Sequence, residues 1–307
     1  MPHILIISSA NMDFVMPTQT FPARGQTVID TGSYRYIPGG KGANSAVAVA
    51  RLGGKCTFCA KLGKDANGDT LAALYAAESI DTACLCRDEE TPTGLAAILV
   101  ESDGANRIIV YPGANSKLNE ADIDRALATR PDAVYLQTEI PTAAVLYASN
   151  AAARLGIPVF LDAGPADPSF PLDRLPPLAV FSPNETEAEI YTGILPENES
   201  QCLACAQALC EKLTARYMVL KLGARGAYCY DTKKKQGKTF PALPVRAVDS
   251  TAAGDAFTAA LTLHYIETGD MPAAIRYANA VGALTVSRAG ASSSIPTEAE
   301  VEQFLTK

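Results

Sequence analysis

Short apolar stretches rich in β-branched residues alternate with alanine-rich stretches along this chain, and no other feature restricts its fold as strongly. The apolar stretches predict strands at Ile4–Ser8, Cys56–Lys61, Ala133–Gln137, Val159–Asp162, Ala179–Ser182 and Tyr217–Leu222. The stretches between them predict helices at Asn44–Leu52, Asp69–Ala77, Glu120–Thr129, Thr142–Leu155, Glu185–Thr192 and Ser200–Leu213. Continuous apolar strands separated by helices indicate a mostly parallel sheet covered on both faces. We therefore expect an α/β fold with three αβα layers.

Two segments break this alternation. Thr27–Ile37 alternates like a strand, and Gly94–Tyr111 has the pattern of a hairpin that turns at Ser102-Asp103-Gly104. Antiparallel pieces do not fit inside a βα alternation, so we expect them to form a small separate sheet. Such a sheet would act as a lid over the ligand edge and bury its outer face against a second subunit; the alternative is an edge extension without function.

Charge and apolar patterning exclude several classes of protein. The net charge is −7 and no long basic run occurs, which disfavours nucleic-acid binding. Lys233-Lys234-Lys235 lies between the strand-like Ala227–Tyr230 and Thr239–Pro241, and is typical of a solvated hairpin loop. The N-terminal run MPHILIISSA has no basic region before it and predicts a first strand rather than a signal peptide. No apolar stretch approaches the ~18 residues of a membrane helix.

The cysteines favour a reduced protein over a metal site. The chain has eight cysteines, with pairs at Cys56/Cys59 and Cys202/Cys205, and only two histidines. On a strand, residues three apart point to opposite faces, which disfavours zinc at Cys56/Cys59. Cys202 and Cys205 follow helical spacing with Leu209 and are typical of a core. Reduced thiols in a cytoplasmic protein fit this pattern best.

Polar residues follow the carboxyl ends of the expected strands, where open parallel sheets bind ligands. They are Asn11, Asp13, Glu139, Asp162, Asn184, Glu187 and the loop Gly223-Ala224-Arg225-Gly226. Any one of them would be ordinary loop polarity, but their gathering at one edge predicts a site there.

Two glycine-containing segments open helices. Gly39-Gly40-Lys41-Gly42-Ala43-Asn44 lets the backbone approach a ligand, or forms only a tight turn. It is neither a P-loop nor a GxGxxG fingerprint, so a nucleotide would have to bind at another segment. Asp249-Ser-Thr-Ala-Ala-Gly-Asp255 offers one, because small residues leave the first amides of the helix from Ala256 to about Thr268 unobstructed. Asp255 would take a proton from an attacking alcohol, and we expect the helix start to keep it ionised; the alternative is a helix cap and a first-turn acid.

Together these segments resemble the ribokinase (PfkB-type) carbohydrate kinases over essentially the whole chain. The resemblance rests on Gly39–Asn44, on Asp249–Phe257 and on Pro183-Asn184-Glu185-Thr186-Glu187 between them. It implies one ribokinase-like domain over residues 1–307, with a lid at about 12–38 and 92–112. The lid would be inserted into an α/β core of residues 1–11, 39–91 and 113–307 and would mediate a homodimer.

The resemblance also implies roles for individual residues. Asp255 would be the general base, and the backbone of Ala252, Ala253 and Gly254 the anion hole. The sugar would be bound by Asn11, Asp13, Gly39, Gly40, Lys41, Asn44, Glu139 and Asp255. ATP would be bound by Asn184, Lys221, Gly223, Arg225, Gly226, Gly254 and Asn279. Glu187 would organise Mg²⁺ through water, and K⁺ would lie at Asp249, Thr251, Thr285, Arg288, Gly290 and Ser294.

The expected reaction is phosphoryl transfer from ATP to D-ribose. Asp13 can accept hydrogen bonds from two adjacent hydroxyls, which favours ribose over 2-deoxyribose. The chain departs from the usual family pattern at Ser45, at Asp162-Ala163-Gly164-Pro165 and at Thr258-Ala259. Deoxyribokinase, another pentose or ketose kinase and a nucleoside kinase are alternatives in the same family. A non-catalytic sugar-binding protein and a dinucleotide-dependent oxidoreductase are alternatives outside it.

Overall fold

The computed structural model describes residues 1–101 and 105–306, and a large sheet lies at its centre. The strands of this sheet are β1 (His3–Ile7), β4 (Lys55–Gly63), β5 (Leu85–Asp88), β8 (Ala133–Gln137), β9 (Val159–Asp162), β10 (Leu178–Ser182), β11 (Ala215–Lys221), β12 (Ala227–Asp231) and β13 (Gln236–Phe240). Within the described residues the order is β13-β12-β11-β10-β9-β8-β1-β4-β5. Neighbours run parallel from β5 to β11, and β12 and β13 add an antiparallel hairpin at one edge. The expected mostly parallel sheet is confirmed.

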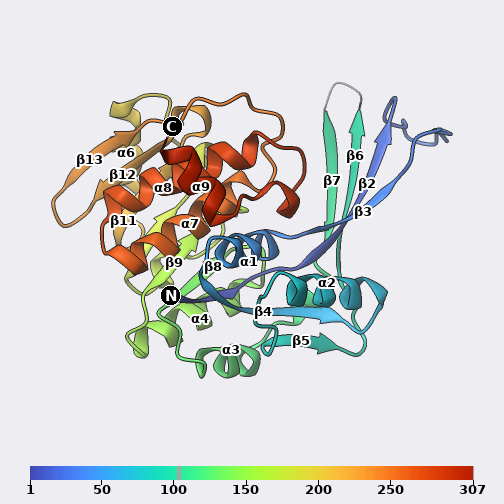
Figure 1. Cartoon of the computed structure of the whole chain (residues 1–307), viewed down its shortest axis with the longest axis horizontal. Helices are drawn as coiled ribbons and strands as arrows, with labels where there is room; N and C mark the ends of the chain where they lie inside the picture. Colours follow the sequence, from blue (N-terminus) through green and yellow to red (C-terminus); the bar gives the residue numbers. More distant parts are fainter. Residues whose placement is uncertain (102–104, 307) are drawn as a thin grey trace.

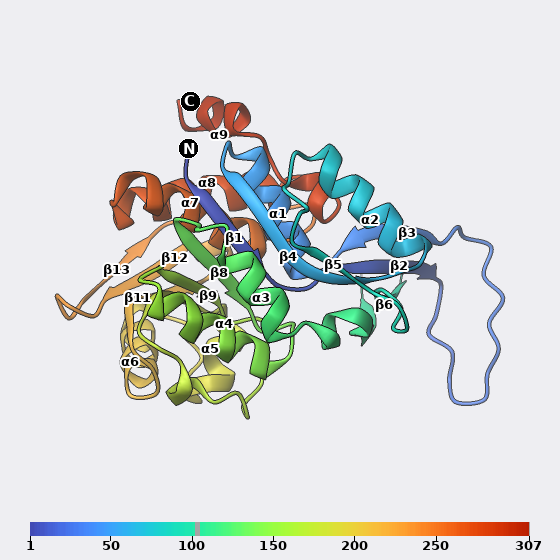
Figure 2. The ribbon, with the colours of Figure 1, turned by 90° about the horizontal axis from the view of Figure 1, so that it is seen from below.

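Helices cover both faces of this sheet, as Figure 2 shows. One layer contains α1 (Lys41–Arg51), α2 (Ala66–Ala77), α7 (Ala253–Thr268), α8 (Met271–Val286) and α9 (Glu298–Leu305). The other contains α3 (Glu120–Leu127), α4 (Thr142–Arg154), α5 (Glu185–Thr192) and α6 (Glu199–Cys210). Short 3-10 helices lie at Gly113–Lys117, Leu172–Arg174, Gly223–Arg225 and Ser292–Ser294. The three αβα layers predicted from the alternation are therefore present.

Two buried clusters join the sheet to its two helical layers. Phe58 and Tyr75 belong to the cluster beneath α1, α2, α7 and α8, and Phe181 belongs to the cluster on the other face. Cys56 lies in the first cluster and Cys59 in the second, so the prediction that they face opposite sides of β4 is confirmed. All eight cysteines are free thiols.

A small second sheet projects from the α/β core beside α2 (Figure 1). Its strands are β2 (Asn11–Thr18), β3 (Arg35–Gly39), β6 (Gly94–Glu101) and β7 (Asn106–Tyr111), in the order β3-β2-β6-β7. β2 and β6 are parallel, and the other pairs are antiparallel. The hairpin predicted at Gly94–Tyr111 is confirmed in its strands, while its expected turn at Ser102–Gly104 lies outside the described residues.

Several predicted boundaries are wrong. Most of Thr27–Ile37 is not a strand, since β3 begins only at Arg35, and the long strand β2 was not predicted. The helix expected from Asn44 begins at Lys41, and the one expected from Ala256 begins at Ala253. Strand β5 and helices α8 and α9 were also missed.

The carboxyl ends of the parallel strands converge on the start of α7. Ser8, just after β1, donates its hydroxyl to Gln137 at the end of β8. Gln137 in turn donates to Asp255 in the first turn of α7. The fold thus places the polar strand ends predicted from the sequence at one edge, next to a helix N-terminus. None of the helices in the described ranges combines the length and apolar character that crossing a membrane requires.

Candidate active site

The carboxylate of Asp255 is the centre of the polar edge. Asn44 donates its amide to Oδ2 at 2.9 Å, and Gln137 donates to Oδ1 at 3.1 Å. The ammonium of Lys41 lies 3.7 Å from Oδ1. These partners come from α1 and β8, so the carboxylate of α7 joins three elements that are far apart in the sequence.

Burial dominates the electrostatics of Asp255. The residue is only 5% exposed, and burial raises the pKa of its carboxyl, while Lys41 and the hydrogen bond from Asn44 lower it. The net shift is upward, and burial is its largest cause, so the expectation that Asp255 is ionised rests on Lys41 and Asn44 as well as on the helix start. A carboxyl with a raised pKa is a stronger proton acceptor once ionised, which suits a general base. Asp255 in turn raises the pKa of Lys41, which therefore stays charged.

The backbone before Asp255 has an unusual conformation. Ala252 has a φ of 62°, in the left-handed region that a residue with a Cβ seldom adopts. The N–H of Ala253 donates to the carbonyl of Ser250 at 3.3 Å, so the prediction that this amide is free is wrong. The N–H groups of Ala252 and Gly254 have no backbone acceptor in the described part of the chain. Of the three amides expected to form an anion hole, those of Ala252 and Gly254 are therefore unused.

Glu139 ties the glycine segment to the end of β1. Its Oε2 accepts the backbone N–H of Lys41 at 3.1 Å and the hydroxyl of Ser9. Gly40 has a φ of 91°, a conformation that favours glycine, and it caps α1. The start of α1 is thus held against the strand ends, with Lys41 directed towards Asp255.

Asp13 lies against Gly39, on neighbouring strands of the small sheet. A Cβ at position 39 would collide with the carboxylate of Asp13, so only glycine leaves room for that side chain. Burial and then the charge of Glu139 raise the pKa of Asp13 to about 7. Ionisation of this buried carboxyl is unfavourable, and hydrogen-bond donors on a ligand would stabilise its ionised form.

Asn115 is a site residue that the sequence reasoning missed. Its amide exchanges two hydrogen bonds with the backbone of Ala10 and donates to Oδ1 of Asn11 at 2.7 Å. A side chain at Gly94 would collide with both asparagines. Asn115 therefore orients Asn11, from a position more than a hundred residues away in the sequence, which no local pattern reveals.

One buried acceptor in the site lacks a donor. Oδ1 of Asn44 is buried and has no hydrogen-bond partner within the described residues, although Nδ2 is used by Asp255. An unpaired buried acceptor costs free energy, which a ligand hydroxyl would recover. The position of this oxygen beside Asp255 fits a polyol.

Asn184 and Glu187 form a capping box at the start of α5. Asn184 accepts the N–H of Glu187 at 2.9 Å, and Oε2 of Glu187 accepts the N–H of Asn184 at 2.7 Å. The second oxygen, Oε1, lies beside Gly164, where a side chain would collide with it. This oxygen has no hydrogen-bond partner among the residues described, so the capping role leaves it available to a metal-bound water.

Two side chains expected near the nucleotide, those of Arg225 and Asn279, form hydrogen bonds to neighbouring loops. Arg225 pairs with Glu185 at 2.6 Å and also donates to the carbonyls of Pro196 and Glu197. Asn279 donates to the carbonyls of Phe240 and Pro241, both at 3.1 Å. Arg225 shapes the loop after β11, in which Gly223 and Gly226 have positive φ angles. Asn279 shapes the loop after β13.

The residues expected to hold K⁺ lie on two adjoining segments. The carboxylate of Asp249 accepts the N–H groups of Thr251 at 2.9 Å and Gly290 at 3.0 Å. The side chains of the other three residues already have partners. Thr285 donates to the carbonyl of Val281, Ser294 donates to the carbonyl of Ala291, and Arg288 pairs with Glu300. Thr285 is part of α8. Oxygen ligands from these residues would therefore be backbone carbonyls, with Asp249 as the one acid.

Comparison with known proteins agrees with this site. Residues 1–298 match the pfkB family of carbohydrate kinases. The chain is 35% identical to a ribokinase of Haemophilus influenzae over 98% of both chains, and 31% identical to a deoxyribokinase of Salmonella typhi over 99% of this chain and 98% of the relative. Its structure superimposes on an Arabidopsis thaliana ribokinase complexed with ribose and ATP with a TM-score of 0.90, at 30% identity, covering 100% of this chain and 99% of the other.

We predict that Asp13→Asn stabilises the protein at neutral and alkaline pH. The pKa of Asp13 is raised to about 7, so native wild type loses stability as pH rises from about 4 through 7, when this buried carboxyl must ionise. An amide does not ionise and avoids this loss. Thermal unfolding across pH 4–9 should therefore show a melting temperature gap in favour of the variant that opens between about pH 4 and 7 and then levels off.

The matched control is Asp30→Asn, which changes an exposed acid of the same region. Its pKa is lowered, chiefly by the N–H of Gly32, so this variant should lose stability at neutral pH rather than gain it. A difference in melting temperature between Asp13→Asn and wild type that does not vary with pH would show that burial does not raise the pKa of Asp13.

Proposed function

The chain belongs to the pfkB family of carbohydrate kinases, and on that premise we propose that it is an ATP-dependent ribokinase, converting D-ribose and ATP to D-ribose 5-phosphate and ADP. The observation that carries this proposal is the buried carboxylate of Asp255, held by Asn44, Gln137 and Lys41 at the start of α7. A buried proton acceptor beside unused helix amides is what an alcohol needs in order to attack a phosphoryl group.

In the proposed reaction, Asp255 takes the proton of the sugar's 5-hydroxyl as its oxygen attacks the γ-phosphorus. The new O–P bond forms while the bond to the β-phosphate oxygen breaks, and ADP leaves. The amides of Ala252 and Gly254 and the dipole of α7 stabilise the charge on the transferred group. Lys41 stabilises Asp255 as an ionised base before the attack, because it lies 3.7 Å from Oδ1.

The sugar is proposed to bind between the small sheet and the start of α1. Asp13 and the unpaired Oδ1 of Asn44 accept hydrogen bonds from adjacent hydroxyls. Gly39 and Gly40 allow the backbone to approach the ring. Asn11, oriented by Asn115, and Glu139 complete the polar wall. In this arrangement the small sheet is a lid over the sugar.

ATP is proposed to lie over the carboxyl ends of β10 and β11. The nucleotide set is Asn184, Lys221, Gly223, Arg225, Gly226, Gly254 and Asn279. Mg²⁺, when bound, neutralises phosphate charge; Glu187 would hold it through water with the oxygen that its cap leaves unused. Asn279 would act by shaping its loop, because both N–H groups of its amide are engaged. Arg225 uses three of its five N–H donors on Glu185, Pro196 and Glu197, and so shapes the loop after β11.

K⁺ is proposed to activate the reaction from beneath the anion hole. Its ligands would be Asp249 and the backbone carbonyls of Thr251, Thr285, Arg288, Gly290 and Ser294. Burial opposes ionisation of Asp249, but hydrogen bonds from Thr251 and Gly290 outweigh it and lower the pKa, so one negative charge is available. One acid among neutral oxygens suits a monovalent ion better than a divalent one. Equal turnover in K⁺ and Na⁺ would argue against this site.

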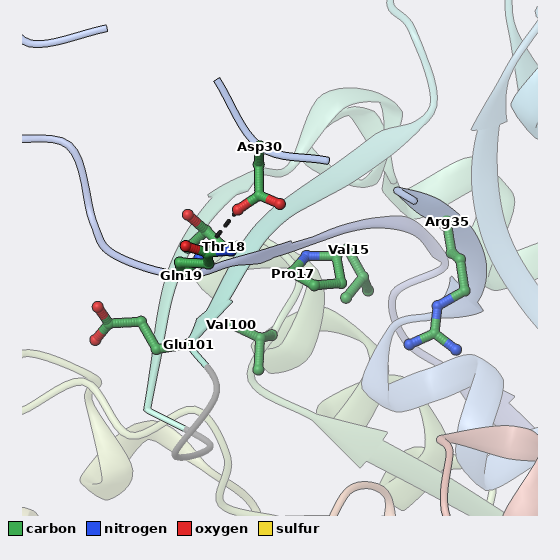
Figure 3. Close-up of a pocket in the computed structure, with 8 residues that line it drawn as sticks. All are labelled: Val15, Pro17, Thr18, Gln19, Asp30, Arg35, Val100 and Glu101. Atoms are coloured by element: carbon green, nitrogen blue, oxygen red, sulfur yellow. Dashed lines mark hydrogen bonds between the residues drawn. The ribbon is translucent and has the colours of Figure 1, made fainter. Parts of the chain in front are cut away.

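The lid is proposed to join two copies of the chain. Register places Ile98, Ile108 and Val110 on the lid face that carries Asp13, so the proposed contact uses this face and not the outer face expected from the sequence. Ile108 is 52% exposed and Val110 is 43% exposed, so this apolar face lies open in the single chain. A hollow on the lid is lined by Val15, Pro17, Thr18, Gln19, Asp30, Arg35, Val100 and Glu101 (Figure 3). A self-complementary contact between two lids would cover this surface.

The eight free thiols support a reducing, cytoplasmic location. Sugar and ATP are the proposed partners. The net charge of −7 disfavours nucleic-acid binding.

The function is tested by measuring ADP release with ATP, Mg²⁺, K⁺ and a panel of pentoses, ketoses and nucleosides. We expect ribose to be the best acceptor. 2-Deoxyribose should lose about 5- to 150-fold in kcat/KM, because a missing hydroxyl leaves an acceptor unpaired at a cost of ~1–3 kcal/mol. Equal or better use of 2-deoxyribose would favour deoxyribokinase instead, and no ADP release with any acceptor would overturn the kinase proposal.

Asp255→Asn should lower kcat by about 10²–10⁴-fold, the usual contribution of a positioned base, while nucleotide affinity stays nearly unchanged. Steady-state kinetics and calorimetric titration with ADP measure the two effects. Asp270→Asn is the matched control, because asparagine caps α8 as well as aspartate does and the residue lies outside the site. Wild-type turnover in Asp255→Asn would remove Asp255 from the role of base.

A double change in the lid, Ile108→Lys with Val110→Lys, should convert a dimer into a monomer, because two buried ammonium groups would oppose the contact. Sedimentation equilibrium measures this. Leu155→Lys is the control: it changes an apolar residue that is 61% exposed at the end of α4, and it should leave the mass unchanged. A wild-type protein that sediments as a monomer at micromolar concentration would refute the lid dimer.

A further inference from the structure

A buried ionic cluster beside the start of α7 has no part in the proton transfer described above. The ammonium of Lys221 lies 2.5 Å from Oδ2 of Asp162. The hydroxyl of Thr258 lies 2.6 Å from the same oxygen and 3.4 Å from the ammonium. All three residues are buried, with Lys221 at 9% exposed and Asp162 at 1%. The cluster joins the ends of β9 and β11 to the first turns of α7.

This cluster is adjacent to the proposed anion hole. The Thr258 hydroxyl lies 3.1 Å from the carbonyl of Gly254. A Cβ placed on Gly254 would lie 3.7 Å from the ammonium of Lys221, with no closer atom of the chain. The charge of Lys221 is also among those that lower the pKa of Asp255. Lys221 therefore brings an ammonium group close to Gly254, the residue whose amide is unused.

Stability of the fold does not explain a lysine at this point. The N-terminus of a helix is its positive end, where a cation is unfavourable. A buried ion pair is seldom more stable than apolar residues of the same size. Lys41 already brings one positive charge to Asp255, and Lys221 brings a second to the same helix end. Lys41 is paired with Asp255 and Lys221 with Asp162, and a bound phosphate would add a further favourable interaction for both ammonium groups.

The hydrogen-bonding capacity of the cluster is not exhausted. An ammonium group has three N–H donors. Within the described residues, Lys221 has two acceptors, and one of them, Thr258, is at the long distance of 3.4 Å. Ser182, which is paired in register with Asp162, has a buried hydroxyl without any partner there. Polar groups left unsatisfied on this sheet face fit an oxygen-rich ligand.

We propose that Lys221 contacts the terminal phosphoryl group of ATP, and that Asp162 is a positioning residue that holds the ammonium beside Gly254. This inference rests on the proposed function and adds a second cation to it. Lys41 stabilises the ionised base, and Lys221 stabilises the charge on the phosphoryl group as it moves to the sugar. No bond to Lys221 forms or breaks, and its proton stays on the ammonium.

The test compares the binding of ADP and of β,γ-imido-ATP, each with Mg²⁺ and without sugar. Lys221→Met alone would leave Asp162 buried and unpaired and could prevent folding. The informative variant is therefore Asp162→Asn with Lys221→Met, which removes both charges and keeps the shapes. Asp162→Asn alone retains the ammonium, and Lys64→Met is a control that removes an exposed lysine.

The double variant should bind β,γ-imido-ATP at least ~10-fold more weakly than wild type and should bind ADP within about twofold, since only the terminal phosphate loses a contact. Its kcat should fall by about 10²–10³-fold, as when one donor to a developing charge is removed. Asp162→Asn alone should keep most of the preference for β,γ-imido-ATP over ADP, and Lys64→Met should keep all of it.

Three results would overturn the proposal. If the double variant binds β,γ-imido-ATP and turns over like wild type, Lys221 only balances the charge of Asp162. If wild type phosphorylates ribose but binds the two nucleotides equally, the function stands and the role of Lys221 fails. If wild type binds neither nucleotide, both proposals fail.

Discussion

The burial of the Asp255 carboxylate is the interaction on which the site depends. Its oxygens are held by Asn44 from α1 and Gln137 from β8, while the residue itself belongs to the first turn of α7. A carboxyl taken out of water must keep these partners, because an unpaired buried charge is costly. The same partners therefore fix the position of the base and hold three elements of the core together. Pairing and burial act in opposite directions on its pKa, and burial prevails.

The sequence predicted the large sheet, its two helical layers and most of the residues around Asp255, because strand ends and glycine-rich helix starts are local patterns. It did not predict Gln137 or Asn115 as members of the site. Gln137 lies 118 positions from Asp255, and Asn115 lies 104 positions from Asn11, so these pairings exist only after folding. Burial is likewise a property of the fold, so the upward shift in the pKa of Asp255 could not be inferred from the local pattern.

The small sheet was predicted in the right region but with the wrong strand. The segment from Thr27 alternates like a strand, yet most of it is exposed and forms no strand pairing with the described residues. β2 contains Pro17, which cannot donate to a ladder and weakens the sequence signal for a strand. In the structure β3 pairs with β2 only as far as Val15, so Pro17 lies beyond the last partner on that side. Pairing, rather than alternation, decides which segment becomes a strand.

The charges around the start of α7 explain how an acidic chain can hold a nucleotide. Asp255, Asp162, Glu139 and Glu187 all raise the pKa of Lys41, so four carboxylates act on one ammonium. All four acids have partners: Asp255 is held by Asn44 and Gln137, and Asp162 is paired with Lys221. Glu139 and Glu187 accept backbone N–H groups at the starts of α1 and α5. Two ammonium groups, of Lys41 and Lys221, lie among these four carboxylates. In the proposed function, Mg²⁺ would lower the charge of ATP that the carboxylates oppose, and Glu187 would hold it through water. The local balance of charge, not the net charge of the chain, is what a nucleotide bound at the start of α7 would meet.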